Sequence, residues 1–209
     1  MSWINEKGPA KDVVLSSRIR LARNIAKYPF PSIMQAQHGM EIAEQVKKSV
    51  LDGKAALNMD FAFMYMKDVP AVERQILVEK HLASQDLMQN YEVSALLLDA
   101  TEKVTVMVNE EDHIRMQCVL PGFQMNQAWE ILNRVDDTIE NEVEYAFHED
   151  LGYLTSCPTN VGTGMRSSAM LHLPALTINK QMNGVLQTIS KIGLLVRGIY
   201  GEGSEALGS

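Results

Sequence analysis

Apolar residues along this chain follow two periods, one typical of helices and the other typical of strands. Helical spacing predicts packing helices in four stretches, over residues 38–51, 69–82, 124–143 and 181–192. Period-two alternation or a short apolar run predicts strands in five others, over residues 12–24, 93–98, 103–108, 166–173 and 194–196. Residues 99–102 have the length of a hairpin loop, so the strands on either side of them should pair antiparallel. The pattern predicts an α+β fold, with an antiparallel β-sheet flanked by helices.

Residues 109–115 interrupt this apolar pattern with four formal charges and a histidine. If the strand over 103–108 continues through them, its period of two places one set of residues together on the face opposite its valines: Asn109, Glu111, His113 and Arg115. An isolated buried charge is strongly destabilising unless it is paired. The run therefore indicates either a functional surface or a solvated edge strand.

Two further segments are suited to binding an anion. Arg18 and Arg20 are two residues apart in a predicted strand, so both guanidinium groups point away from Ile19 and Leu21. They form either a two-pronged anion site or a pair of ordinary surface arginines. Residues 152–168 are rich in small and turn-forming residues, whose backbone N–H groups can approach an anion closely. Because this segment has neither the dinucleotide-binding fingerprint nor the lysine-bearing phosphate loop, it does not by itself identify a ligand.

Composition narrows the class of protein. The 209 residues are 46% hydrophobic and 22% charged, which suffices for one domain with a substantial core. No run approaches the roughly 20 apolar residues of a membrane span, and no secretory signal pattern is present, so we expect a cytoplasmic protein without membrane contact. The formal net charge of -7 argues against general nucleic-acid binding, so a local cluster must hold any anion. Cys118 and Cys157 match no zinc spacing and are expected to be free thiols.

Four segments together resemble the guanidino phosphotransferase family, and most closely its bacterial protein-arginine kinases. These segments are residues 17–20, 109–115, 157–166 and 197–202, in the order that the family shows. The resemblance implies a guanidino-kinase catalytic domain of the glutamine-synthetase-like type over residues 1–209. It also implies an ATP-dependent kinase, with ATP and Mg²⁺ as cofactors, that phosphorylates the guanidinium of arginine side chains in proteins.

The resemblance assigns roles to individual residues. The phosphates of ATP would be held by five arginines with a histidine beside them: Arg18, Arg20, Arg115, Arg166, Arg197 and His81. Glu111 and Glu202 would hold the guanidinium of the substrate, and the thiol of Cys157 would lie against the reacting group. Five planar, permanently charged groups suit a triphosphate, because phosphoryl transfer needs charge stabilisation and alignment more than covalent help.

The proposed acceptor needs help from carboxylates. A guanidinium nitrogen is a poor nucleophile, because its lone pair is delocalised and its pKa is above about 12. Two flanking carboxylates would align the group, and Glu111, which the arginines are expected to keep ionised, would take the proton during transfer. The sequence shows no side-chain cage for a metal. Mg²⁺ would then be held chiefly by phosphates and water, with Glu110 and Asp112 in reach of its water shell.

Three departures from the family pattern bear on substrate and activity. The arginine pair begins at residue 18, which leaves no room for the helical domain that precedes it in kinases of small guanidines, and this favours a protein-borne arginine as substrate. Met170 stands where many of those kinases have a histidine. The family domain would continue beyond Ser209 into a C-terminal helical domain, so we expect a truncated chain.

Two alternatives stay open at this point. The chain could be a kinase of small guanidines, or a regulatory fragment that binds a nucleotide or a partner without turnover. Among the relatives, partners include a heat-shock repressor, a protein-unfolding ATPase and a zinc-binding activator protein, which would link the chain to a stress response. The sequence itself shows none of these partners.

Overall fold

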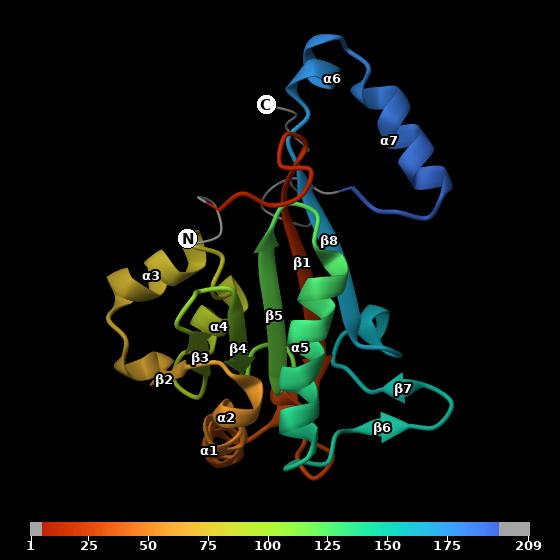
Figure 1. Ribbon diagram of the computed structural model, residues 1–209. Coiled ribbons are helices and arrows are strands. Elements are labelled where there is room, and N and C mark those ends of the chain that lie inside the picture. Colours follow the sequence, from red (N-terminus) through yellow and green to blue (C-terminus); the bar gives the residue numbers. More distant parts are fainter. Residues whose placement is uncertain (1–5, 197–209) are drawn as a thin grey trace.

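The computed structural model describes residues 6–196, which form a six-stranded antiparallel sheet flanked by helices (Figure 1). The strand order in this sheet is β2-β3-β4-β5-β1-β8. Its members are β1 (Val14–Arg23), β2 (Phe61–Tyr65), β3 (Ala95–Asp99), β4 (Val104–Val108), β5 (Ile114–Pro121) and β8 (Met165–Leu171). A separate hairpin pairs β6 (Phe147–His148) with β7 (Gly152–Tyr153). The predicted fold class is confirmed.

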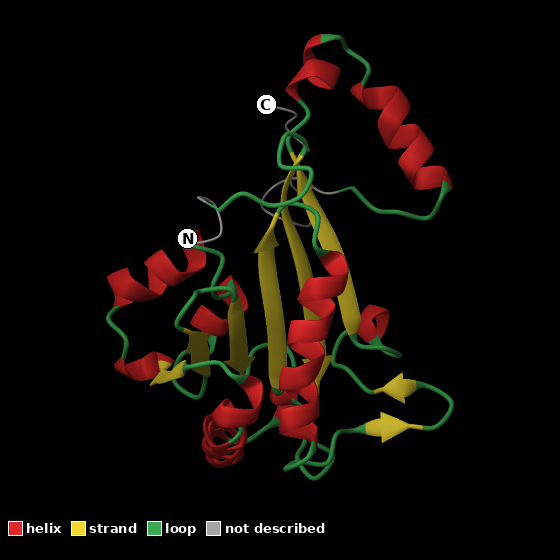
Figure 2. Cartoon of the chain, in the orientation of Figure 1, coloured by secondary structure: helices red, strands yellow, loops and turns green. Residues whose placement is uncertain are grey.

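Helices form where the apolar spacing predicted them, with ends that differ by a few residues (Figure 2). The longer ones are α1 (Ala36–Asp52), α3 (Ala71–Glu79), α5 (Met125–Glu140) and α7 (Met182–Lys191). The shorter ones are α2 (Lys54–Leu57), α4 (Gln85–Gln89) and α6 (Pro174–Ile178), with 3-10 helices at Pro31–Ile33, Met66–Asp68 and Pro158–Asn160. In Figure 1, α5 lies lengthwise across β1 and β5, as its amphipathic pattern indicated.

Two apolar clusters fill the two faces of the sheet. The larger cluster joins Ile19 and Leu21 of β1 to the buried sides of α1 and α5. The smaller lies on the opposite face and contains Met66, Ala83, Leu87, Leu96 and Met107. β1 therefore turns Ile19 and Leu21 toward α5 and turns Arg18 and Arg20 the other way, as its alternation predicted.

The prediction that the strand over 103–108 continues through residues 109–115 is wrong. β4 ends at Val108, and residues 109–113 form a tight turn that leads into β5. Asn109 has a left-handed φ of 59°, and its N–H donates to the carbonyl of His113 over 2.9 Å. Asparagine tolerates this backbone conformation better than most residues do. The charged residues are therefore gathered at one end of the sheet and are not spread along one face of a strand.

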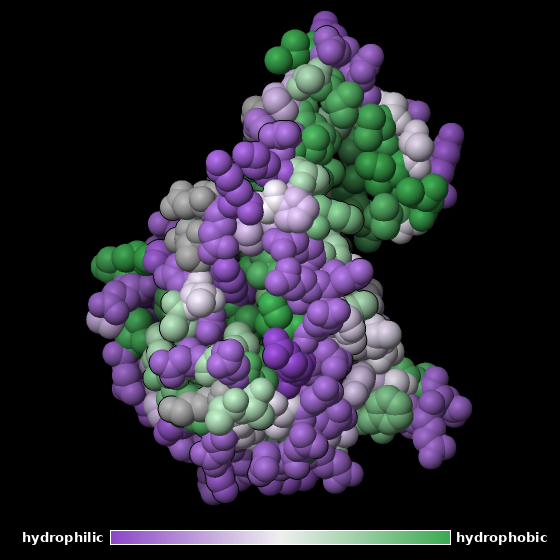
Figure 3. Space-filling view, viewed as in Figure 1, coloured by the Kyte–Doolittle hydropathy of each residue, from purple (hydrophilic) through white to green (hydrophobic). Residues whose placement is uncertain are grey.

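The last described segment also differs from the prediction. Residues 194–196 are not in a strand, and Leu195 is 81% exposed. The helix α6, which the apolar pattern did not predict, follows β8, and Figure 1 shows α6 and α7 projecting beyond the end of the sheet. Apolar side chains gather over these helices in Figure 3, and no residue of either is buried. No helix in the described part of the chain is long and apolar enough to cross a membrane.

Candidate active site

Four of the arginines that the resemblance singled out come together on one face of the sheet. Arg20 of β1 pairs with Arg166 of β8, and Ala22 pairs with Arg115 of β5. Directly opposed residues of antiparallel strands project to the same face. Because Arg18, Arg20 and Ala22 are two residues apart along β1, all four guanidinium groups lie on the face opposite α5. We call this surface the arginine face.

Arg18 carries the clearest electrostatic sign of an anion site. Its Nε is buried and has no hydrogen-bond partner among the described residues. Burial, and then the nearby charge of Arg115, lower the pKa of Arg18 to about 10, with Arg166 adding to the shift and Glu110 opposing it. The guanidinium stays protonated at neutral pH, but its charge is poorly stabilised. A bound anion would satisfy both the charge and the unpaired Nε.

His81 lies beside the arginine face. It follows α3 with a left-handed φ of 55°, and its carbonyl accepts a hydrogen bond from Nε2 of Gln117 over 2.7 Å. Gln117 is paired with Arg20 across β1 and β5. Burial, and then the charge of Arg18, lower the pKa of His81, so the imidazole is neutral at physiological pH. A neutral ring can add one donor and one acceptor to the site without adding charge.

The carboxylate of Glu110 is buried and bound to Arg115. Nη1 of Arg115 donates to both oxygens of Glu110, over 2.6 and 2.7 Å, and the Glu110 side chain has 0% exposure. Burial alone would raise the pKa of Glu110, but the charge and hydrogen bonds of Arg115 outweigh it and lower the pKa below its usual value. Glu110 thus anchors an arginine of the site and is not directed at solvent, where the water shell of a metal would lie.

Asp112 and His113 hold the turn against its neighbours. Asp112 is buried, and its Oδ1 accepts the N–H of Ser156 over 2.6 Å. Nδ1 of His113 accepts the N–H of Ile25 over 3.0 Å, which leaves Nε2 to donate to the carbonyl of Pro29 over 2.9 Å. Burial lowers the pKa of His113, in keeping with a neutral ring. The prediction that His113 belongs to a common functional face is therefore wrong, because both of its ring nitrogens bind backbone.

Glu111 is the carboxylate of the turn that remains exposed. It lines a small hollow on the arginine face together with residues from other segments: Arg20, Arg115, Asn160 and Arg166. Burial raises the pKa of Glu111, the charges of Asp112 and Glu110 raise it further, and Arg115 only partly opposes them. The expectation that the arginines keep Glu111 ionised concerns the site with a nucleotide bound and stays a prediction. A raised pKa suits a group that must accept a proton near neutral pH.

Glycine lets the segment before β8 reach the end of β1. Gly164 has a φ of +61°, and a Cβ there would lie 2.5 Å from Nη1 of Arg23 and 2.6 Å from the carbonyl oxygen of Ala22. The carbonyl of Gly164 accepts the N–H of Ala22 over 2.8 Å. Only glycine suits both the left-handed backbone and this close approach. The segment thereby brings Cys157 and Asn160 to the end of the sheet that carries Glu111.

The two thiols should differ in reactivity. Cys118 is fully buried, and burial raises its pKa to about 12, whereas Cys157 is partly exposed with its Sγ 3.0 Å from Oγ1 of Thr159. We expect iodoacetamide to alkylate Cys157 at least about tenfold faster than Cys118 near pH 8, because the thiolate is the reacting species. Mass spectrometry over a time course measures both rates, and unfolding in urea should equalise them. Equal rates in the folded protein would contradict this arrangement.

Sequence reasoning missed a buried ion pair next to the site. Arg23 is 2% exposed, and its Nη2 donates to Oδ2 of Asp136 in α5 over 2.7 Å. Its Nη1 donates to the carbonyl of Thr163 over 3.0 Å, and its guanidinium carbon lies 3.7 Å from the centre of the Tyr153 ring. The strand period places Arg23 on the apolar face of β1, which requires a buried counter-charge and could have revealed the pair.

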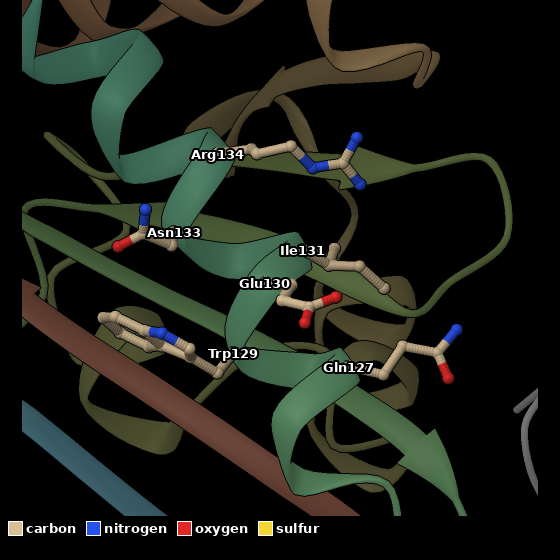
Figure 4. Close-up of a pocket in the computed structure, with 6 residues that line it drawn as sticks. All are labelled: Gln127, Trp129, Glu130, Ile131, Asn133 and Arg134. Atoms are coloured by element: carbon tan, nitrogen blue, oxygen red, sulfur yellow. The ribbon is translucent and has the colours of Figure 1, made fainter.

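A more open hollow lies elsewhere, on the solvent side of α5 (Figure 4). It is lined by Gln127, Trp129, Glu130, Ile131, Asn133 and Arg134. Figure 4 shows that all six side chains come from this one helix, which covers the sheet face opposite the arginines. The hollow contains no part of the arginine cluster, so we do not assign the chemistry to it.

Three of the expected features need separate mention. Arg197 and Glu202 lie outside the described residues. Within residues 6–196, no group of three His, Cys, Asp or Glu side chains is placed to hold a metal ion. Met170 pairs with Ser16 at the far end of β8 from Arg166, on the same side of the sheet as the arginines.

Comparison with known proteins points to one family. The sequence model of the family "ATP:guanido phosphotransferase, C-terminal catalytic domain" matches residues 41–209. The protein-arginine kinase of Caldanaerobacter subterraneus subsp. tengcongensis is 52% identical over 198 residues, which are 95% of this chain and 59% of that protein. The protein-arginine kinase of Pelotomaculum thermopropionicum is 48% identical over 99% of this chain and 58% of its own length. The chain therefore spans less than two thirds of the length of these relatives.

Solved structures share the fold at low sequence identity. The duplicated taurocyamine kinase from Schistosoma mansoni, with bound transition state analog components, has a TM-score of 0.80 at 24% identity, over 97% of this chain and 29% of its own. Lombricine kinase has a TM-score of 0.75 at 22% identity, over 95% of this chain and 57% of its own. The family match begins after β1, yet β1 lies between β5 and β8 and supplies Arg18 and Arg20 to the arginine face.

Proposed function

The chain belongs to the ATP:guanido phosphotransferase family, and on that premise we propose that it is the catalytic part of a protein-arginine kinase. The proposed reaction moves the γ-phosphoryl group of ATP to the guanidinium of an arginine side chain in a protein. Identities of 52% and 48% to curated protein-arginine kinases, over nearly the whole chain, support this acceptor. We take residues 1–209 as one catalytic domain that acts in the cytoplasm.

The observation that carries the proposal is the arginine face with Glu111 at its edge. Arg18, Arg20, Arg115 and Arg166 project from three neighbouring strands to one face, where the last three line a hollow and the Nε of Arg18 has no partner within the described chain. Each guanidinium can donate two parallel hydrogen bonds to phosphate oxygens. In the proposed complex these arginines and His81 hold the ATP phosphates, and Arg197 would add a fifth guanidinium.

On the acceptor side, the proposed steps involve two carboxylates and a thiol. Glu111 would align the guanidinium of the substrate and accept its proton as the nitrogen bonds to the γ-phosphorus and the bond to the β-phosphate oxygen breaks. Glu202 would hold the guanidinium from a second direction, and Cys157 would lie against it. The raised pKa of Glu111 supports its role, because it makes this carboxylate a stronger base than an ordinary glutamate.

Mg²⁺ is the proposed second cofactor. Glu110 and Asp112 are engaged by Arg115 and by the N–H of Ser156, and no cluster of three ligating side chains occurs in the described chain. The ion would therefore be held by phosphate oxygens and water, as Mg²⁺ commonly is with nucleotides. When bound, it would neutralise charge on the β- and γ-phosphates.

Two other functions remain candidates on specific grounds. A kinase of small guanidines is supported by the fold shared with the taurocyamine and lombricine kinases. A regulatory module that binds nucleotide without turnover is supported by the arginine face, which could hold phosphates whether or not transfer follows. Only the protein-arginine kinase proposal includes the partners that the resemblance implies. These are a heat-shock repressor, a protein-unfolding ATPase and a zinc-binding activator protein.

Incubation with ATP labelled at the γ-phosphate tests the proposal directly. We expect label on an arginine-rich protein that is lost on acid treatment, because a phosphorus–nitrogen bond to a guanidinium is acid-labile. Free arginine and creatine in parallel reactions separate a protein acceptor from a small one. Binding of Mg-ATP by calorimetry with no transfer to any acceptor would favour the regulatory module instead.

Substitution of Arg18 should reveal the two-pronged grip on phosphate. We expect Arg18→Ala to weaken ATP binding by about 1.5 to 3 kcal/mol, the usual contribution of a hydrogen bond to a charged group. Arg18→Lys should recover only part of that loss, because lysine keeps the charge but lacks the planar pair of donors. Titration calorimetry measures both, with Arg134→Lys on the solvent side of α5 as a matched control. Equal affinity for the Arg18→Lys variant and the parent would contradict a bidentate contact.

A further inference from the structure

Asn24 connects three separate parts of the chain next to the site. It follows directly after β1 and is 1% exposed. Its Nδ2 donates to Oδ1 of Asp112 over 2.6 Å and to the carbonyl of Leu154 over 3.1 Å, while its Oδ1 accepts the N–H of His113 over 2.9 Å. The backbone carbonyl of Asn24 accepts the N–H of Ala146 over 2.7 Å. Every polar atom of this carboxamide is therefore used to join the turn 109–113 to the segment that leads to Cys157.

One carboxylate oxygen completes the connection. Oδ1 of Asp112 accepts both Nδ2 of Asn24 and the backbone N–H of Ser156, each over 2.6 Å. Asp112 directly follows Glu111, and Ser156 directly precedes Cys157. Consecutive Cα atoms are about 3.8 Å apart, so fixing Asp112 against Ser156 fixes the backbone at both reacting groups of the proposed site.

The turn and the segment have little else to hold them together. The turn closes on itself through bonds from the N–H groups of Asn109 and Glu110 to the carbonyls of His113 and Asp112. Within residues 6–196, the hydrogen bond from Ser156 to Asp112 is the one that directly joins the turn 109–113 to residues 152–157. Asn24 reinforces it from β1, which is itself held between β5 and β8.

We propose that Asn24 is a positioning residue for phosphoryl transfer, which sets the separation of Glu111 and Cys157 by holding the Asp112–Ser156 contact. This inference rests on the function proposed above. The arginine face is placed by the strand register of β5, β1 and β8 and does not depend on Asn24. Loss of Asn24 should therefore affect the acceptor guanidinium and leave ATP affinity unchanged.

The variant Asn24→Asp tests this with little change in shape. It keeps an acceptor for the N–H of His113, but it replaces the donor Nδ2 with an oxygen that faces Oδ1 of Asp112. We expect kcat/KM for the arginine-bearing protein to fall about 10²-fold, the effect of a misplacement of about 1 Å, with Kd for ATP within about twofold of the parent. The backbone N–H of Ser156 should exchange with solvent faster, as measured by NMR.

Two further variants separate positioning from general stability. The double variant Asn24→Asp/Asp112→Asn pairs the two side chains again, but it should not recover kcat/KM or the protection of Ser156, because an Nδ2 in place of Oδ1 of Asp112 cannot accept the N–H of Ser156. Ser49→Ala removes a hydrogen bond of another buried residue, from Oγ to the carbonyl of Gln45 over 3.0 Å, within α1. It should lower stability without changing either readout. Asn24→Ala serves as the test variant if the carboxylate pair prevents folding.

The outcomes decide between the inference and its premise. Normal kcat/KM in Asn24→Asp together with fast exchange at Ser156 would overturn the positioning role, and so would a parallel loss of ATP affinity. If the parent transfers no phosphate at all, the proposed function fails, and exchange at Ser156 alone then tests the contact. Unchanged protection of that N–H in both Asn24 variants would overturn the inference in that case as well.

Discussion

Replacing Glu111 with glutamine should lower the rate of phosphoryl transfer by roughly 10²- to 10⁴-fold, the usual effect of removing a positioned general base. Glutamine keeps the shape and one acceptor of Glu111 but cannot take a proton or balance the guanidinium. ATP affinity should stay within about twofold of the parent, because the phosphates are assigned to arginines. Single-turnover assays measure the transfer rate, and calorimetry measures ATP binding, in a protein with demonstrated activity.

The neighbouring carboxylate provides a matched control with the opposite outcome. Glu110 is buried against Arg115, so Glu110→Gln should release an arginine of the site and lower thermal stability and ATP affinity together. Two adjacent glutamates would then give two distinct phenotypes. A Glu111→Gln variant that transfers phosphate at near the parent rate would end its assignment as the base.

The effect of Glu111 on stability distinguishes a catalytic from a structural role. The fold raises the pKa of Glu111, so folding disfavours its charged form. The resulting loss of folding stability is fully present above the folded pKa and vanishes below the pKa of an ordinary glutamate. Glu111→Gln should therefore not lower the free energy of unfolding at neutral pH. A residue that stabilised the fold through an ion pair would show the reverse.

Arg23→Met should lower the free energy of unfolding by about 3 to 5 kcal/mol, the usual loss when one partner of a buried ion pair is removed. The variant leaves Asp136 charged, buried and without the 2.7 Å hydrogen bond from Nη2 of Arg23. It also removes the donor to the carbonyl of Thr163. Urea denaturation near pH 8 measures the loss. A loss of stability below about 1 kcal/mol would contradict the view that buried Asp136 needs the charge of Arg23.

The pH dependence of this deficit has a defined sign. Burial raises the pKa of Asp136 even though Arg23 opposes the shift, and without Arg23 the pKa should rise further. A protonated Asp136 needs no counter-charge. The stability lost in Arg23→Met is therefore largest above the pKa of Asp136 in the folded variant and becomes smaller as the pH falls through that pKa. In the double variant Arg23→Met/Asp136→Leu, most of the lost stability should return at all pH values, because an apolar pair can replace a buried ion pair.

The spacing of apolar residues correctly predicted which face of a strand or helix is buried. The period of two along β1 separated Arg18 and Arg20 from Ile19 and Leu21, and the helical period identified α5 as the cover of the opposite face. Both predictions succeeded because an apolar side chain must be buried wherever its element packs.

The same patterns could not predict contacts between polar groups. The turn at Asn109 depends on a left-handed backbone that a run of charges does not signal, and so the placement of His113 was wrong. The roles of Arg23 and Asn24 arise from partners more than eighty residues away in the chain, as the bond from Asn24 to Asp112 illustrates. The raised pKa of Glu111 follows first from the partial burial of its carboxylate, which the sequence does not show, and then from the charges of Asp112 and Glu110, which are its neighbours in the sequence.

The position of β1 between β5 and β8 has a consequence for how the protein folds. In Figure 1 the red strand β1 lies between the green β5 and the blue β8. The first strand in the sequence therefore pairs with the last strand of this sheet. Closing such long loops costs conformational entropy before any contact offsets it, and high contact order slows folding. During synthesis, Arg18 and Arg20 leave the ribosome long before Arg166 does, and they cannot form the arginine face until it follows. The arginine face is therefore complete only in a nearly complete sheet, so the nascent chain must keep β1 from pairing elsewhere until β5 and β8 arrive.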